Sequence, residues 1–118
     1  MLDEGIKAKA IELAESIRGL GEYQEFLENE KLLREDEVAQ ELLAEFQQKQ
    51  QDFVTKQLSG EYDQDLLSEL TELQSKLNAR ESVVRFIESY NRLLAVIGEV
   101  VDLISEKIEL DIGEVYRR

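Results

Sequence analysis

One uninterrupted apolar row in the last third of the chain constrains the fold more than any other feature. Its members alternate spacings of four and three residues: Val83, Ile87, Tyr90, Leu94, Ile97, Val101, Ile104 and Ile108. Phe86, Leu93 and Val100 add a third apolar position to each seven-residue repeat. This width is typical of a helix packed in a bundle, because a simple coiled coil needs only two positions. The pattern predicts a long C-terminal helix, which we start at a capping box formed by Asn78 and Glu81.

The rest of the chain also has the pattern of helices. It contains no Pro and only 6 Gly, so it offers few breaks. A first helix is predicted from the row Ile6, Ala10, Leu13, Ile17 and Leu20, and a short second helix from Tyr23, Phe26, Leu27 and Leu33. Gly19 and Gly21 separate the two, as a helix stop and a short connection.

A third helix is predicted from about Asp36, its N-cap, to Leu58. Its expected seam contains two glutamines: Ala39, Leu43, Phe46, Gln50, Phe53 and Gln57. The glutamine-rich second half is either a solvated helix end or a polar tip that binds a partner. Gly60 is suited to the left-handed conformation that closes this helix.

A fourth helix follows, with Leu66, Leu70, Leu73 and Leu77 on one face and Asp63 or Asp65 as its cap. We therefore predict an all-α fold: an antiparallel helical bundle of about five helices with a long helical hairpin and a long C-terminal helix. The length of 118 residues fits one domain spanning residues 1–118.

Composition excludes several classes of function. With 14 Lys+Arg against 27 Asp+Glu, the formal net charge is 14 − 27 = −13, which disfavours direct binding to nucleic acids and anionic membranes. The absence of Cys and His removes thiol chemistry, disulfides and imidazole metal ligands. No signal peptide or membrane span is recognisable at the sequence level, so we expect a soluble, cytoplasmic protein.

Carboxylates share helix faces in several pairs, among them Glu12/Glu15 and Asp102/Glu106. Such pairs are usually a solvated surface, although a Mg²⁺ or Ca²⁺ site or a carboxylate-based, metal-dependent hydrolase is conceivable. No phosphate-binding or dinucleotide-binding glycine motif accompanies them. We predict no enzyme activity, no catalytic residues, no metal and no cofactor.

Several segments together resemble one family of small bacterial helical proteins. They are the acidic Glu35-Asp36-Glu37 before Phe46, the turn Lys56-Gln57-Leu58-Ser59-Gly60-Glu61, then Leu77-Asn78, Phe86 and Glu88, and Leu93-Leu94-Ala95-Val96-Ile97-Gly98-Glu99 leading into Leu103-Ile104. Over about residues 3–112, the chain is similar to the YlbF/YmcA (Com_YlbF) family, including its YheA-like branch.

The resemblance implies an all-α, oligomeric, non-catalytic regulator. Members of that family act in competence, sporulation and biofilm control, in a complex that adjusts RNA processing by a ribonuclease. The expected partners are sister family members or a ribonuclease complex. Some members hold iron–sulfur clusters with cysteines; this chain has no Cys, so that property does not transfer. A structural or chaperone-like helical oligomer is the alternative.

The length of the last helix supplies a separate argument for self-association. From Asn78 to Glu109 it would extend about 47 Å, against a diameter of about 35 Å for a compact globule of this length. Its apolar surface would then need cover from a second copy or a partner, and we expect a homodimer or larger assembly. The predicted interface residues are Leu93, Leu94, Ile97, Val100, Val101 and Ile104. Gly98, in the middle of this helix, is either tolerated or marks a close helix–helix approach.

Overall fold

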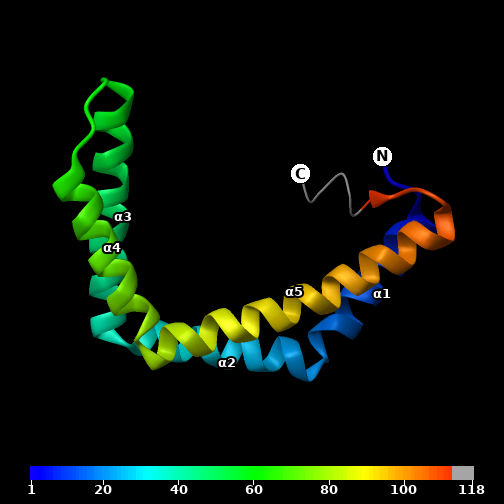
Figure 1. Ribbon diagram of the computed structural model, residues 1–118. Helices are drawn as coiled ribbons and strands as arrows, with labels where there is room; N and C mark the ends of the chain where they lie inside the picture. Colours follow the sequence, from blue (N-terminus) through cyan, green and yellow to red (C-terminus); the bar gives the residue numbers. More distant parts are fainter. Residues whose placement is uncertain (113–118) are drawn as a thin grey trace. The chain divides into compact units, whose positions relative to one another are not determined.

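The computed structural model describes residues 1–112 and is all-α, as predicted (Figure 1). Its helices are α1 (Glu4–Arg18), α2 (Gly21–Glu35), α3 (Glu37–Leu58), α4 (Gln64–Asn78) and α5 (Glu81–Ile108). No strand occurs within residues 1–112. The five predicted helices and the long C-terminal helix are confirmed, and residues 113–118 of the predicted domain lie outside the described part.

Aspartate side chains cap three of the helices. Asp3, Asp36 and Asp63 each accept a hydrogen bond from the backbone N–H three residues later, at 3.0–3.2 Å. These bonds satisfy amide donors that a helix start leaves without a partner. The predicted caps at Asp36 and Asp63 are therefore confirmed. Gly60 has φ of +86°, which confirms the left-handed turn expected after α3.

The predicted start of the last helix is wrong by three residues. Asn78 ends α4, and α5 begins at Glu81. The Asn78 side-chain oxygen accepts a hydrogen bond from the Gln74 side chain one turn earlier, at 3.0 Å, so it stays with α4. Only Ala79 and Arg80 connect the two helices, and the 28 residues of α5 extend about 42 Å.

The chain divides into two compact units. One comprises residues 28–87; the other combines residues 1–27 with the chain from residue 88 onward. In the first unit α3 and α4 form an antiparallel hairpin (Figure 1). Its core cluster contains Ala39, Leu77 and Val83, with Leu33, Leu42, Leu43 and Phe46 packed against it.

The inner face of α3 differs from the predicted seam towards the turn. Gln50 and Gln57 are exposed, whereas the preceding residues Lys49 and Lys56 are half-buried. Their ammonium groups reach carboxylates on the α4 side of the hairpin: Lys49 pairs with Glu69 at 2.9 Å, and Lys56 with Asp63 at 2.7 Å. A lysine can cover apolar surface with its stem while its charge remains accessible. The predictions for Gln50 and Gln57 are therefore wrong for the same reason: the helical period alone does not show which of two adjacent polar residues lies on the inner face.

The second unit contains little enclosed core. Here α2 and α5 meet through the rings of Phe26 and Tyr90, whose centroids are 5.9 Å apart, and through an ion pair between Glu25 and Arg92. Helix α1 has no buried residue. Much of the apolar surface of this unit is therefore open, and it is the natural place to look for function.

Candidate protein-docking face

Most of the large apolar residues of α5 lie in two adjacent rows that differ in burial, and the first of these rows also contains Ser89. The covered row is buried or half-buried within the chain: Val83, Phe86, Ser89, Leu93, Val96 and Val100. The uncovered row follows the predicted spacing of four and three in the second unit: Tyr90, Leu94, Ile97, Val101, Ile104 and Ile108. All of these are exposed except Val101, which is half-buried. One face of α5 therefore packs within the chain, and the adjacent face is mostly exposed.

The predicted interface residues divide between these rows. Leu93 is only 7% exposed and belongs to the intramolecular core, and Val100 lies beside it in the covered row. Leu94, Ile97 and Ile104 are 44%, 37% and 40% exposed and, with Val101, belong to the uncovered row. The apolar pattern alone did not separate these two sets, because both have the same residue types at neighbouring positions.

Tyr90 shows how the uncovered row begins. The sequence favours a core residue with its hydroxyl directed outward. In the structure one part of the ring lies against Phe26 of α2, while the residue as a whole is exposed. An aromatic side chain that is half covered and half open is a common component of protein interfaces, because it offers apolar area at low entropic cost.

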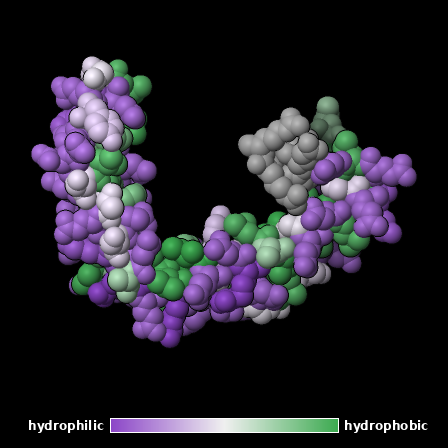
Figure 2. Space-filling view, viewed as in Figure 1, coloured by the Kyte–Doolittle hydropathy of each residue, from purple (hydrophilic) through white to green (hydrophobic). Residues whose placement is uncertain are grey.

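A second open apolar face lies on α1. Ile6, Ala10 and Leu13, the first residues of the predicted row, are exposed, and only Ile17 and Leu20 are half-buried. Hydrophobic surface is visible along α5 and in the region of α1 in Figure 2. Contiguous exposed apolar surface is typical of sites that bind other proteins.

Gly98 lies beside the uncovered row near the middle of α5. Apart from its chain neighbours and the backbone of its own helix, no atom of the described residues lies within 4 Å of a Cβ built on Gly98. No other described helix of this chain therefore approaches Gly98 closely, and tolerance or a close approach by a helix of another chain stay as the two alternatives. A glycine in a helix interior costs about 1 kcal/mol relative to alanine, and internal packing offers no compensation here.

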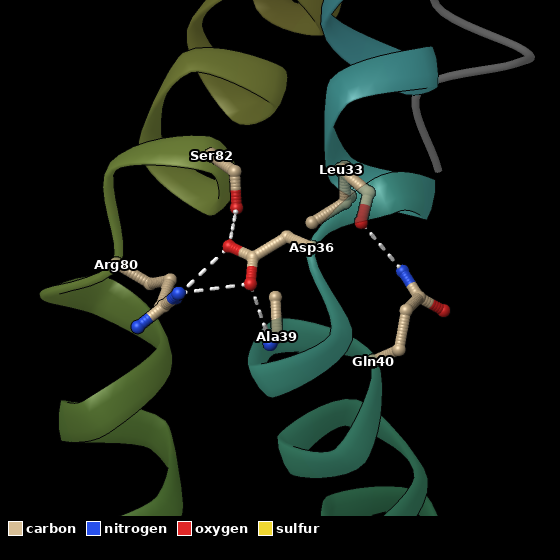
Figure 3. A network of polar contacts seen from close by, with 6 residues as sticks. All are labelled: Leu33, Asp36, Ala39, Gln40, Arg80 and Ser82. Atoms are coloured by element: carbon tan, nitrogen blue, oxygen red, sulfur yellow. Dashed lines mark hydrogen bonds and ion pairs between the residues drawn. The ribbon is translucent and has the colours of Figure 1, made fainter.

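The strongest polar cluster is in the other unit, at the start of α3 (Figure 3). Arg80 donates two hydrogen bonds to the Asp36 carboxylate, both at 2.9 Å, and the Ser82 hydroxyl donates a third at 2.6 Å. The Asp36 side chain is 15% exposed and also caps α3 through Ala39. These bonds, the one from Arg80 first, hold the pKa of Asp36 well below its usual range.

This cluster has a structural role. Arg80 and Ser82 both donate to the Asp36 carboxylate, and these bonds connect the α2–α3 turn to the α4–α5 turn. The sequence predicted Asp36 as a cap but gave no role to Arg80, because 44 residues separate the partners and no local pattern indicates their contact.

Among residues 1–112, no group of three or more His, Cys, Asp or Glu side chains is arranged to hold a metal ion. In the same residues, no buried side-chain N or O atom lacks a hydrogen-bond partner. The groove beside the α3–α4 turn is lined by Lys56 and Asp63, which already pair with each other.

None of the described helices combines the length and the apolarity that crossing a membrane requires. The exposed apolar residues of α5 and α1 are the main candidate for a functional surface among the described residues.

Comparison with known proteins agrees with this picture. The model of the family Com_YlbF, described as control of competence regulator ComK, YlbF/YmcA, matches residues 6–109. No curated protein matches the chain. Among solved structures, the chain is similar to Bacillus subtilis RicA, solved in complex with RicF. The TM-score is 0.76 at 22% identity, over 98% of this chain and 99% of that one. At this identity the likeness establishes a shared fold.

Proposed function

Since the chain belongs to the Com_YlbF family, we propose that it is a non-enzymatic adaptor or regulatory protein that acts through helix-mediated contacts with other proteins. The observation that supports this most is the uncovered row of α5, a set of large apolar side chains left open by the chain's own fold. The family's printed role, control of a competence regulator, fits a protein that works by binding and not by catalysis.

The kind of partner follows from the same comparison. RicA is solved in complex with RicF, so a protein of this fold associates with another protein chain. We propose that this chain likewise binds sister family members, in the cytoplasm, as part of an assembly that adjusts competence or RNA processing. An acidic surface is consistent with a role that leaves direct contact with RNA to other subunits.

An affinity pull-down from the native bacterial lysate, read by mass spectrometry, tests the proposal. We expect the wild-type chain to recover a sister family member or a ribonuclease. Leu94→Asp, in the uncovered row, should lose these proteins, because a charge would be buried in the interface.

Leu103→Asp is the matched control. Leu103 is an exposed leucine of α5, but it lies nine residues from Leu94, two and a half turns around the helix, and outside the uncovered row. It should retain the partners. Recovery of many unrelated unfolded proteins would instead support the chaperone-like alternative, and loss of partners in neither variant would contradict the assignment of the uncovered row.

A further inference from the structure

We propose that the turn end of the α3–α4 hairpin docks a basic segment of a partner protein, in which a large apolar side chain is accompanied by Lys or Arg. We define the hairpin end as the exposed apolar residues Val54, Leu58 and Tyr62 together with the carboxylates of Glu61 and Asp65. It lies where α3 turns back into α4, away from the α4–α5 connection (Figure 1). The inference goes beyond the proposed function, because it gives the chain a protein-binding surface separate from the uncovered row of α5.

The first argument is the exposure of apolar side chains that the turn itself does not use. Leu58 is 85% exposed and Tyr62 is 64% exposed. The backbone closes α3 in a Schellman motif: Gly60 has a positive φ, and the N–H of Glu61 donates to the carbonyl of Lys56 at 2.9 Å. In this motif an apolar contact frequently joins the two positions that Lys56 and Glu61 occupy here, and these two residues carry opposite charges instead. The turn is therefore closed without Leu58 or Tyr62.

Tyr62 is held in place although most of it is open. Its ring meets the ring of Phe53 edge-on, with the centroids 5.9 Å apart. The ring is thereby restrained before any partner arrives, so less conformational entropy is lost when a second protein covers it. An aromatic side chain of this kind offers a large contact area together with a hydroxyl for hydrogen bonding.

The face of α3 around Val54 and Leu58 contains no charged group. These two residues lie one turn apart, and the neighbours on their face are the exposed glutamines Gln47, Gln50 and Gln51. A partner's apolar side chain can cover this face without desolvating a charge, and the amides can form hydrogen bonds with the partner. Of the two alternatives that the glutamine-rich half of α3 left open, this arrangement favours a tip that binds a partner.

The charge around the hairpin end selects the kind of partner. Residues 52–65 contain four acidic residues and one lysine, or 1 − 4 = −3. The lysine, Lys56, is already paired with Asp63 at 2.7 Å. A partner segment that carries Lys or Arg is therefore attracted to this end of the hairpin, and an acidic segment is repelled.

A specific place for such a cation lies beside Tyr62. An open hollow there is lined by Glu61 and Asp65. Within residues 1–112, neither of these two carboxylates takes part in an ion pair. A Lys or Arg side chain in the hollow would face carboxylates and an aromatic ring, both of which attract a cation. Apolar and cationic side chains of one short segment can thus be bound together.

A fluorescently labelled short peptide in which Lys and Leu alternate is the probe, and fluorescence anisotropy measures its binding to the full chain. We expect Leu58→Ser to weaken binding by about fivefold to tenfold, through lost apolar contact. Glu61→Gln should weaken it by about two- to threefold, because the contact is solvent-exposed. Both side chains are exposed, so the variants should keep the circular dichroism of the wild type.

Glu41→Gln is the matched control for the charge. Glu41 is also an exposed glutamate of the hairpin, but it lies about 25 Å along α3 from Leu58, and its neutralisation should leave the affinity unchanged. A peptide with Glu in place of every Lys should not bind. The inference is overturned if the basic peptide does not bind the wild type, or if Leu58→Ser leaves its affinity unchanged. It is also overturned if Glu41→Gln and Glu61→Gln weaken binding equally, since that indicates only a general attraction to an acidic chain.

The result is separable from the proposed function. Leu94→Asp, which should lose its partners in the pull-down, should bind the peptide at least as strongly as the wild type does. If the peptide fails to bind while the pull-down separates Leu94→Asp from Leu103→Asp, this inference fails and the proposed function stands. If the peptide binds as expected and the pull-down does not separate those two variants, the assignment of the uncovered row fails and the hairpin end stands.

Discussion

The hairpin of α3 and α4 and the second unit, built around most of α5, have similar amphipathic sequences. They differ in how much of their apolar surface is buried within the chain. In the hairpin unit, four of the five leucines of α4 are buried. Asp36, Asp63 and their cationic partners close both ends of the helix pair. In the second unit, α1 buries nothing and half of the apolar width of α5 stays open. The difference shows that an apolar helix face does not measure how well a helix packs within its chain, because α5, with the longest apolar row, keeps most of that row exposed.

The largest loss of stability is expected from a substitution in the core of the hairpin unit. Leu77 is 3% exposed and packs with Ala39 and Val83. We expect Leu77→Ala to reduce the free energy of unfolding by about 2–5 kcal/mol, through lost transfer energy and a cavity. Leu94→Ala, in the uncovered row, is the matched change and should cost far less in a dilute monomer. Chemical denaturation measures both, and equal losses would contradict the division into covered and uncovered rows.

The next largest loss of stability is expected when the Asp36 carboxylate is removed. Asp36→Ala loses the cap of α3 and strands the Arg80 guanidinium, so we expect the melting temperature to fall by roughly 5–10 °C. Asp36→Asn keeps a capping oxygen but not the charge, and it should lie between wild type and Asp36→Ala. Thermal denaturation at pH 7 followed by circular dichroism gives the order.

The same carboxylate predicts a dependence of stability on pH. Its folded-state pKa lies below the ordinary value of 3.8, so the unfolded chain takes up a proton first as the pH falls. The stabilisation is complete above about pH 5 and is lost progressively below the ordinary pKa, towards the lower folded-state value. Asp36→Asn should flatten this part of the curve. An unchanged slope would show that other acids, such as Asp63 with its lowered pKa, dominate.

Gly98→Ala sharpens the comparison because two effects of opposite sign are expected. Alanine raises helix propensity and meets no internal atom, so the monomer should gain up to about 1 kcal/mol of stability. If Gly98 marks a close helix–helix approach in the expected homodimer, the added methyl group would separate the two helices and weaken self-association by about fivefold or more. Denaturation at low concentration and sedimentation at high concentration measure the two effects. If Gly98→Ala increased both the stability of the monomer and the strength of self-association, Gly98 would not mark a close helix–helix approach.

The smallest effect is expected at the ion pair between Lys49 of α3 and Glu69 of α4. The Lys49–Glu69 pair is accessible to solvent, and exposed ion pairs contribute little to stability. Lys49→Met should therefore change the melting temperature by no more than about 2–3 °C, since the apolar stem is retained. A large fall in the melting temperature would mean that this ion pair stabilises the hairpin as strongly as the Asp36 cluster does.

Much of the fold was predictable because the determining signals are local. Apolar spacing located all five helices, and Asp36, Asp63 and Gly60 marked their ends. The start of α5 was not predictable, because Asn78 is a plausible cap until the contact with Gln74 is known. The link between Asp36 and Arg80 depends on two turns meeting in space, which no spacing rule contains.

The candidate interface was predictable only as an undivided set. Leu93 and Leu94 are adjacent residues of the same type, and one is buried while the other is open. What separates them is the position of α2 against α5, marked by the contacts of Phe26 and Glu25. In a helix with three apolar positions per repeat, some of these positions are buried within the chain and the others are exposed. Tertiary packing decides which positions are buried.

The mass of the intact chain in solution, by sedimentation equilibrium over a range of micromolar concentrations, tests the central claim most directly. The account predicts twice the chain mass of 13.7 kDa for the wild type and for Leu103→Asp, and a shift to 13.7 kDa for Leu94→Asp without loss of helix content. A wild-type mass of 13.7 kDa throughout, or a dimer unaffected by Leu94→Asp, would contradict it.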